Sequence, residues 1–298
     1  MAQHPATPKA KRLALRTAAA VLGPRTASRL LHPTPSEQAA LTLRATPRQT
    51  APANPTVTFL IPLVGRHHVS DWSAVEARLT ATLASFTAQT APNWQAVICG
   101  QDAPSLPDDP RFTFLPFTEP TKGNDKWRKL AQLSATLPRL PHGYAMPFDA
   151  DDLLAPTAVA EMTARKSASG YLVTTGWVYD AGTKGLALAS PQSLRQPGQK
   201  AFWKLCGSCA AFRHSATAEE AAFLTALTQH EHRMFPYLAA LAGRRLTPLR
   251  APAALYILNH GENFGARRGR VSFKTRFVTR FPAKNPSDVL ARFPMLAP

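Results

Sequence analysis

The chain has 298 residues, of which 45% are apolar and 18% charged, so it is long enough to bury a full core as one large domain with extensions. Three cysteines, Cys99, Cys206 and Cys209, cannot form a disulfide framework, and we interpret them as structural. No stretch reaches the ~18 consecutive apolar residues that a membrane-spanning helix requires. The basic start also lacks the clean apolar core of a signal peptide, so we expect a cytoplasmic protein.

The net charge of +17 is unevenly distributed along the chain. Residues 1–55 hold eight Lys or Arg against Glu37, and residues 266–298 hold eight against Asp288, so each segment carries +7. The middle, residues 56–265, carries only +3. We therefore predict a basic Ala/Pro-rich N-terminal extension (1–55), a globular domain (56–265) and a basic C-terminal tail (266–298). Such tails attract polyanions nonspecifically, and no specific nucleic acid is expected as a partner.

The predicted elements alternate between strands and helices. Prolines interrupt the extension, which predicts one helix near residues 9–22. The domain then reads, in chain order, as strand 57–64, amphipathic helix 75–89, strand 94–100, strand 111–117, helix 126–137, strand 144–148, two strands within 171–189, strand 207–212 and a helix through 218–243 apart from Pro236. This order predicts an α/β fold with a mixed, mainly parallel sheet flanked by helices.

A cluster of carboxylates follows the strand at 144–148, in the segment FDADDLL. In an extended chain Asp149 and Asp151 lie on one side and Asp152 on the other, unless the strand has ended in a turn. Hard oxygen ligands packed this closely are best neutralised by Mg²⁺ or Mn²⁺. A solvated acidic loop explains these three residues equally well, and a phosphatase-type loop is disfavoured because Leu153 stands where that motif has Thr or Val.

The order of four motifs resembles family 2 and related GT-A glycosyltransferases, with their Rossmann-like fold, over residues 56–265. The first strand ends in Leu60-Ile61-Pro62, and the first helix ends in Ser85-Phe86-Thr87-Ala88-Gln89-Thr90. Trp94 precedes the second strand, and FDADD corresponds to the Asp-x-Asp-Asp segment of the family.

This resemblance implies a nucleoside-diphosphate sugar, UDP- or GDP-linked, bound at the strand ends with Mg²⁺ or Mn²⁺. It implies Asp149 near the ribose or the metal, Asp151 as the principal metal ligand, and Asp152 beside them or toward the acceptor. Pro62 and Asp102 would line the donor site, although the base-reading aspartate of the family is displaced here to Asp102.

Two further positions follow from the same resemblance. Lys126 and Lys129, nearly one helical turn apart, could reach the diphosphate, and a solvated helix face explains them equally well. The family often carries a Tyr-x-x-x-His pattern whose histidine approaches the metal, and Tyr256 and His260 fit it.

The catalytic base is left open among three adjacent residues. Where the family commonly has Glu-Asp at the head of a helix, this chain has His230, Glu231 and His232. Glu231 is the preferred choice because a carboxylate there can take a proton from the acceptor hydroxyl. The expected reaction is transfer of a sugar to a glycan, lipid-linked or protein acceptor, with inversion.

Two other functions compete with this enzyme: a noncatalytic polyanion or nucleic-acid binder, and a glycosyltransferase-like pseudoenzyme. The C-terminal tail adds an expectation about location. Phe273, Phe277 and Phe281 recur at four-residue spacing among basic residues, which suits a helix lying peripherally on the anionic inner face of a membrane. A helix packed on the domain fits that pattern equally well.

Overall fold

The computed structural model describes residues 3–47, 50–119, 123–260 and 271–296. It is a mixed α/β structure whose larger sheet has seven strands in the order β10-β6-β9-β4-β1-β2-β3. The strands of this sheet are β1 (Thr56–Pro62), β2 (Trp94–Gly100), β3 (Phe112–Pro116), β4 (Gly143–Pro147), β6 (Gly170–Leu172), β9 (Ala210–His214) and β10 (Thr247–Pro248). Its pairings are parallel except those of β9, which runs antiparallel to both β4 and β6.

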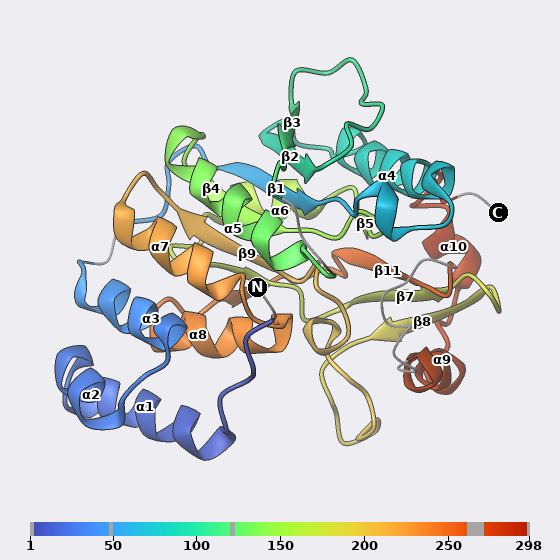
Figure 1. Ribbon diagram of the computed structural model, residues 1–298. Coiled ribbons are helices and arrows are strands. Elements are labelled where there is room, and N and C mark those ends of the chain that lie inside the picture. Colours follow the sequence, from blue (N-terminus) through green and yellow to red (C-terminus); the bar gives the residue numbers. More distant parts are fainter. Residues whose placement is uncertain (1–2, 48–49, 120–122, 261–270, 297–298) are drawn as a thin grey trace.

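Helices flank this sheet and complete the fold class predicted from the sequence, a mixed and mainly parallel α/β fold (Figure 1). The helices are α4 (Trp72–Thr87), α5 (Lys126–Thr136), α6 (Ala158–Arg165), α7 (Ala218–Leu227) and α8 (Phe235–Leu241). Helix α5 packs over β1 and β2, and it also contacts α7, which packs against β9. Strand β1 is almost fully buried, as its apolar, β-branched sequence predicts.

A second sheet of four strands lies beside the first, in the order β5-β11-β7-β8. Its strands are β5 (Leu153–Leu154), β7 (Gly176–Asp180), β8 (Gly185–Ala189) and β11 (Ala254–Leu258). Strands β7 and β8 form the hairpin expected within 171–189, whereas the start of that segment, β6, belongs to the larger sheet. Strand β11 pairs parallel with β7 and antiparallel with β5.

The N-terminal extension contains more structure than the single predicted helix. That helix is present as α1 (Lys9–Val21), and α2 (Pro24–Leu31) and α3 (Pro35–Ala45) follow it. The prolines begin these helices instead of preventing them, since Pro24 and Pro35 occupy first-turn positions where a missing N–H costs nothing. Thr34 caps α3 in a capping box with Glu37.

The C-terminal tail also folds onto the body. Helix α9 (Val271–Arg280) is the predicted amphipathic helix, and it packs on β7, β8 and β11; α10 (Pro286–Leu290) follows. Phe277 is buried, Phe281 is half-buried and Phe273 remains exposed, so most of the apolar stripe is used within the protein. The predicted boundary between residues 265 and 266 lies outside the described residues. Within the described part of the chain, no helix combines the length and apolar character needed to span a bilayer.

Candidate functional site

Five residues, 148–152, connect the two sheets, and the last four of them carry the acidic cluster. Strand β4 ends at Pro147 and β5 begins at Leu153, and the backbone N–H of Asp152 donates to the carbonyl of Asp149 at 3.3 Å. We call residues 149–152 the aspartate turn. Because the strand has ended, the turn brings all three carboxylates together, with candidate ligand oxygens within 4.8 Å of one another. It lies at the carboxyl end of β4, where the strand order reverses around β1, and open α/β sheets bind ligands at such points.

The loop before β9, which contains Cys206 and Ser208, is hydrogen-bonded to the aspartate turn. Asp152 is fully buried, and its Oδ2 accepts from Ser208 Oγ at 2.6 Å and from the Cys206 thiol at 3.0 Å. Ser208 Oγ in turn accepts from the backbone N–H of Asp149 at 2.9 Å. A Cβ at Gly207 would lie 2.9 Å from Asp149 Oδ2, so a larger residue there would displace this carboxylate. The free cysteines of this loop are therefore structural, as predicted, although Cys206 supports the acidic cluster directly.

Each partly buried carboxylate of the turn, Asp149 and Asp151, has a basic partner. Lys126 Nζ, at the start of α5, lies 2.5 Å from Asp149 Oδ1, so a predicted diphosphate-binding lysine is brought to a predicted donor-site aspartate. Burial would lower the pKa of Lys126, but the carboxylates, Asp149 first, raise it above its usual value. The lysine is therefore charged at neutral pH.

His260, the histidine of the Tyr-x-x-x-His pattern, lies beside Asp151. Strand β11 ends at Leu258, and His260 Nε2 lies 2.8 Å from Asp151 Oδ2. Arg78 of α4 fixes this segment by donating to the His260 carbonyl at 2.6 Å. Burial would raise the pKa of Asp151, but the hydrogen bond and charge of His260, then the charges of Lys126 and Arg78, lower it. Asp151 is therefore ionised and available to a cation.

The donor set of the turn fits a divalent cation. Carboxylate oxygens are the ligands that Mg²⁺ and Mn²⁺ prefer. Buried Asp152 Oδ1 has no hydrogen-bond partner among the described residues, so a nearby cation would offset an unpaired polar atom. Burial, followed by the charges of Asp151 and Asp149, raises the pKa of Asp152, and positive charge at the turn would oppose that effect. The three aspartates could therefore hold a metal ion.

One side chain beside the turn, Lys274, was not identified as a site residue from the sequence. The Lys274 ammonium, on α9, donates to the hydroxyl of Tyr256 on β11 and lies within electrostatic reach of Asp149 and Asp152. Burial lowers the pKa of Lys274, while the neighbouring thiol and carboxylates act in the opposite direction. The basic tail thus brings one charge into the site. No local motif signals this, because Lys274 is distant in sequence from the aspartates.

The remaining predicted donor-site residues lie on neighbouring strand ends. Pro62 ends β1 in register with Cys99, and Asp102 Oδ2 accepts from the backbone N–H of Arg66 at 2.8 Å just beyond β2. Lys129 differs from its prediction. It is fully buried, pairs with Asp125 at 2.9 Å and donates to the Leu63 carbonyl at 2.6 Å, so it neither lies on a solvated helix face nor extends toward a diphosphate.

The three candidate bases do not lie on one continuous α-helix, which corrects the prediction for residues 218–243. Helix α7 ends at Leu227, and Glu231 has extended backbone angles before the short 3-10 helix η4 (His232–Met234). Pro236, expected to interrupt the helix, instead lies in the first turn of α8. The helix ends near residues whose side chains bond to other parts of the protein. The Gln229 side chain donates to the Trp127 carbonyl at 2.9 Å, and His230 Nε2 lies 2.7 Å from Ser36 Oγ.

These three residues also point in different directions. His230 is buried, with Nε2 2.7 Å from Ser36 Oγ and its ring 5.4 Å from that of His4, so its contacts are with the N-terminal extension. His232 lies near the site, where burial and then the charges of Arg233, Lys126 and Lys274 lower its pKa to about 3. Glu231 is partly exposed, with Oε1 3.7 Å from Arg233 Nε. The structure therefore separates His230 from the other two.

The sheet and the aspartate turn define an α/β protein with a candidate metal centre at its strand ends. No protein-family model matches the sequence, and no curated protein matches it. Among solved structures, S. aureus TarS aligns over 68% of this chain at 12% sequence identity, with a TM-score of 0.39. The aligned region spans 37% of TarS, well under half of its length. A likeness of this size defines neither a family nor an activity, so function has to be inferred from the residues themselves.

Proposed function

We propose that this protein is a metal-dependent glycosyltransferase that moves a sugar from a UDP- or GDP-sugar to a glycan, lipid-linked or protein acceptor, with inversion. The observation that carries the proposal is the aspartate turn, where three carboxylates and His260 meet at the carboxyl end of a parallel strand. This position and donor set suit a cation bound together with substrate phosphates.

In this proposal Asp149, Asp151 and His260 hold the metal, while Ser208 and Cys206 keep the turn in place through Asp152. A bound Mg²⁺ or Mn²⁺ would neutralise the charge of the departing diphosphate. Lys126 is placed to contact the same phosphates because its ammonium group already lies beside Asp149. Pro62 and Asp102 line the donor side at the ends of β1 and β2.

Glu231 is proposed as the base that takes the proton from the acceptor hydroxyl. It is partly exposed and keeps carboxylate oxygens accessible, whereas His230 is engaged with Ser36. His232 is uncharged near neutral pH and adjoins the site, so it is the alternative base. Glu231→Gln should lower turnover roughly 10²-fold with little change in donor affinity, since a general base acts on the chemical step.

The metal assignment is tested by calorimetry of UDP- and GDP-sugars with Mn²⁺ or Mg²⁺ present, and again after chelation. The wild-type chain should bind one class of donor only with the metal, and Asp151→Asn should abolish that binding while thermal unfolding stays cooperative. The matched control is Asp108→Asn, which removes an exposed carboxylate from another loop. Donor binding that persists in Asp151→Asn, or that is independent of chelator, would rule out the metal assignment.

The same measurements separate the competing functions. A pseudoenzyme binds the donor with metal but shows no turnover with any acceptor, and Glu231→Gln then changes nothing. A polyanion binder shows strongly salt-dependent association that survives Asp151→Asn. If His232→Ala abolishes turnover and Glu231→Gln does not, the histidine is the base.

A further inference from the structure

Helices α1 and α2 present apolar side chains to solvent in a basic setting. Six large hydrophobic side chains are exposed among the described residues, and four belong to these helices and the link between them: Leu13 (66%), Val21 (75%), Leu22 (52%) and Leu30 (60%). A cluster of exposed aliphatic side chains is unusual on a water-soluble surface and indicates contact with something apolar.

The outward face of α1 is itself apolar. Helix α1 buries Leu15 and Ala19 on the protein, and the residues opposite them are all exposed: Ala10, Leu13, Ala14, Thr17, Ala20 and Val21. A surface helix normally directs polar residues to water on this side. Apart from Thr17, its polar residues lie instead at the edges of the apolar face, among them Lys9 and Arg16, which is the arrangement of a helix lying at a lipid interface.

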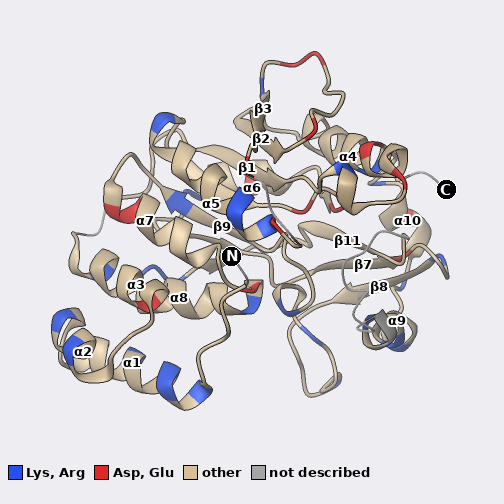
Figure 2. Cartoon of the chain, viewed as in Figure 1, with Lys and Arg blue, Asp and Glu red and all other residues tan. Residues whose placement is uncertain are grey.

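The charge of this region has one sign. Described residues 3–36 contain six basic side chains and no acidic ones: Lys9, Lys11, Arg12, Arg16, Arg25 and Arg29. The first acid is Glu37, which is fully buried and accepts hydrogen bonds from Thr7 and Tyr237. Figure 2 shows this contrast between α1 and α2, with basic residues only, and the acidic residues elsewhere on the chain.

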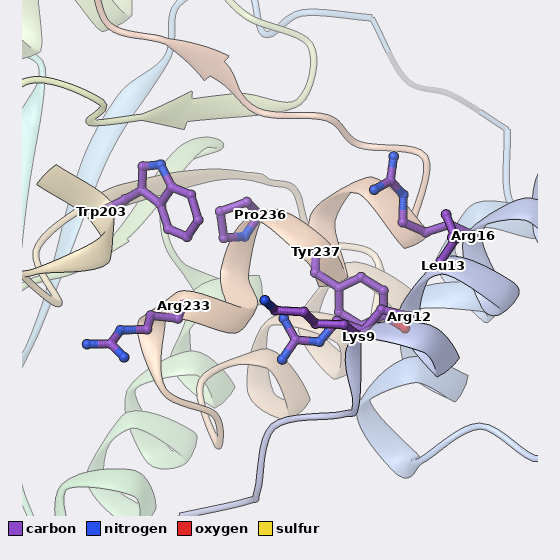
Figure 3. A pocket seen from close by; sticks show the side chains of 8 residues that line it. All are labelled: Lys9, Arg12, Leu13, Arg16, Trp203, Arg233, Pro236 and Tyr237. Atoms are coloured by element: carbon purple, nitrogen blue, oxygen red, sulfur yellow. The ribbon is translucent and has the colours of Figure 1, made fainter. Parts of the chain in front are cut away.

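A basic groove of about 290 Å³ joins α1 to the body of the protein. It is lined by Lys9, Arg12, Leu13, Arg16, Trp203, Arg233, Pro236 and Tyr237. In Figure 3, Lys9 and Arg12 lie beside the ring of Tyr237, with Arg233 and Trp203 toward the other end. The Arg12 guanidinium lies 5.5 Å from the Tyr237 ring centre. Leu13 belongs both to this groove and to the outward face of α1, so the two surfaces are continuous.

We propose that α1 and α2 form a membrane-docking surface, in which the exposed leucines and valine enter the headgroup region of an anionic bilayer and the basic groove receives a lipid phosphate. The apolar face explains why the partner is a lipid surface instead of a soluble polyanion, and the groove supplies cations at the depth of the headgroups. This inference does not depend on the proposed transfer reaction.

The test is co-sedimentation of the full chain with phosphatidylcholine vesicles, with and without phosphatidylglycerol, in the absence of any nucleotide sugar. The wild-type chain should bind the anionic vesicles only. The double variant Lys9→Gln/Arg16→Gln should bind about 25-fold more weakly, because each basic residue near the surface contributes about 5-fold. Leu13→Ser/Val21→Ser, which keeps the charge, should weaken binding about 10-fold or more.

The matched control is Arg276→Gln/Arg280→Gln, which removes the same charge from exposed positions of α9. Its binding should be unchanged. Equal losses in the two charge variants would mean nonspecific attraction, and full binding by Leu13→Ser/Val21→Ser would exclude insertion; either result overturns the proposal. Binding of inorganic pyrophosphate that requires Lys9 and Arg16, with no vesicle binding, would make the groove a site for soluble phosphates and also overturn it.

Discussion

The two basic extensions carry the same charge, +7 each, but differ in how they relate to the body of the protein. The N-terminal one forms three helices, of which α3 packs on α7 and α8 while α1 and α2 expose aliphatic side chains. The C-terminal one packs α9 on the second sheet, and the segment after it pairs with β8 through Ala283 and Leu186. Charge alone therefore does not indicate the role of a tail. The burial or exposure of its large apolar side chains does.

The largest effect is expected from removing an aromatic anchor of the C-terminal extension. Phe293 is 1% exposed, with its ring 5.8 Å from that of Trp177. Phe293→Ala should reduce the free energy of unfolding by about 3–5 kcal/mol because it leaves a cavity in the core of the second sheet. Phe273→Ala, at an exposed position of the same extension, should cost less than ~1 kcal/mol. If urea unfolding shows a loss for Phe293→Ala as small as the loss for Phe273→Ala, the C-terminal extension is not part of the core.

A second effect tests whether the C-terminal extension takes part in the site. Lys274→Met removes a cation that faces Asp149 and Asp152. Divalent metal should then bind the chain more tightly, because a competing charge is gone, whereas a nucleoside diphosphate with metal should bind about 10- to 100-fold more weakly. Calorimetry with the metal alone, and then with the metal and the nucleoside diphosphate, measures the two affinities. If both affinities rise or both fall in Lys274→Met, the lysine does not have this role.

A smaller effect concerns the attachment of the N-terminal extension. Buried Glu37 accepts hydrogen bonds from Thr7, Tyr237 and the backbone of Thr34, at 2.7, 2.8 and 2.9 Å. Burial would raise the pKa of Glu37, but these bonds lower it below the unfolded value of 4.5. Glu37→Gln should therefore cost about 1–2 kcal/mol at neutral pH.

That cost has a defined pH dependence. A carboxylate with a lowered pKa in the folded state stabilises the protein above the unfolded value of 4.5, and this contribution is lost as the pH falls through the folded value. The difference between wild type and Glu37→Gln in urea unfolding should thus shrink below pH ~4.5. A difference that stays constant down to pH ~3 would show that the charge of Glu37 is not what attaches the extension.

The smallest effect is a pH response at the same interface. Burial, and then the neighbouring His4, lower the pKa of His230 below 6.5. Because the unfolded chain takes up the proton first, the packing around His230 should weaken as the pH falls below about 6.5, by on the order of 1 kcal/mol. Limited proteolysis of the first 45 residues should be faster at pH ~5.5 than at pH ~7.5.

His230→Gln should remove that acceleration, since a glutamine can still bond Ser36 without titrating. His142→Gln, an exposed histidine elsewhere, is the control and should leave it intact. No change of cleavage rate with pH in the wild-type chain would exclude the response. Together these four experiments separate an extension built into the core from one attached through polar contacts.

Local patterns predicted much of the larger sheet and the centre of the candidate site. Strands β1 to β4 and the helices between them follow from continuous apolar runs and helical periodicity, which depend on neighbours in sequence. The aspartate turn and His260 follow from short motifs. Ser208, Cys206 and Lys274 could not be predicted because they reach the aspartates from one loop and one helix that are distant in sequence, through the packing of the two sheets.

The helix expected at 218–243 failed for a related reason. Its composition is helical throughout, but Gln229 and His230 bond to Trp127 and Ser36, which are distant in sequence. Tertiary hydrogen bonds of this kind override local propensity, and they also separate the three candidate bases. Residue spacing alone therefore predicted neither the separation of these three residues nor that His232 lies within electrostatic reach of Lys126 and Lys274.

The aspartate turn is a short covalent link between two sheets, since β4 lies in one and β5 in the other. His260 arrives from the second sheet, whereas Ser208 precedes a strand of the first. The carboxylates are therefore held in position from both sides of a seam. A small movement of one sheet relative to the other would change the distances between the carboxylates. A ligand that binds all of them would oppose that movement, so a filled site should make the packing of the two sheets more rigid.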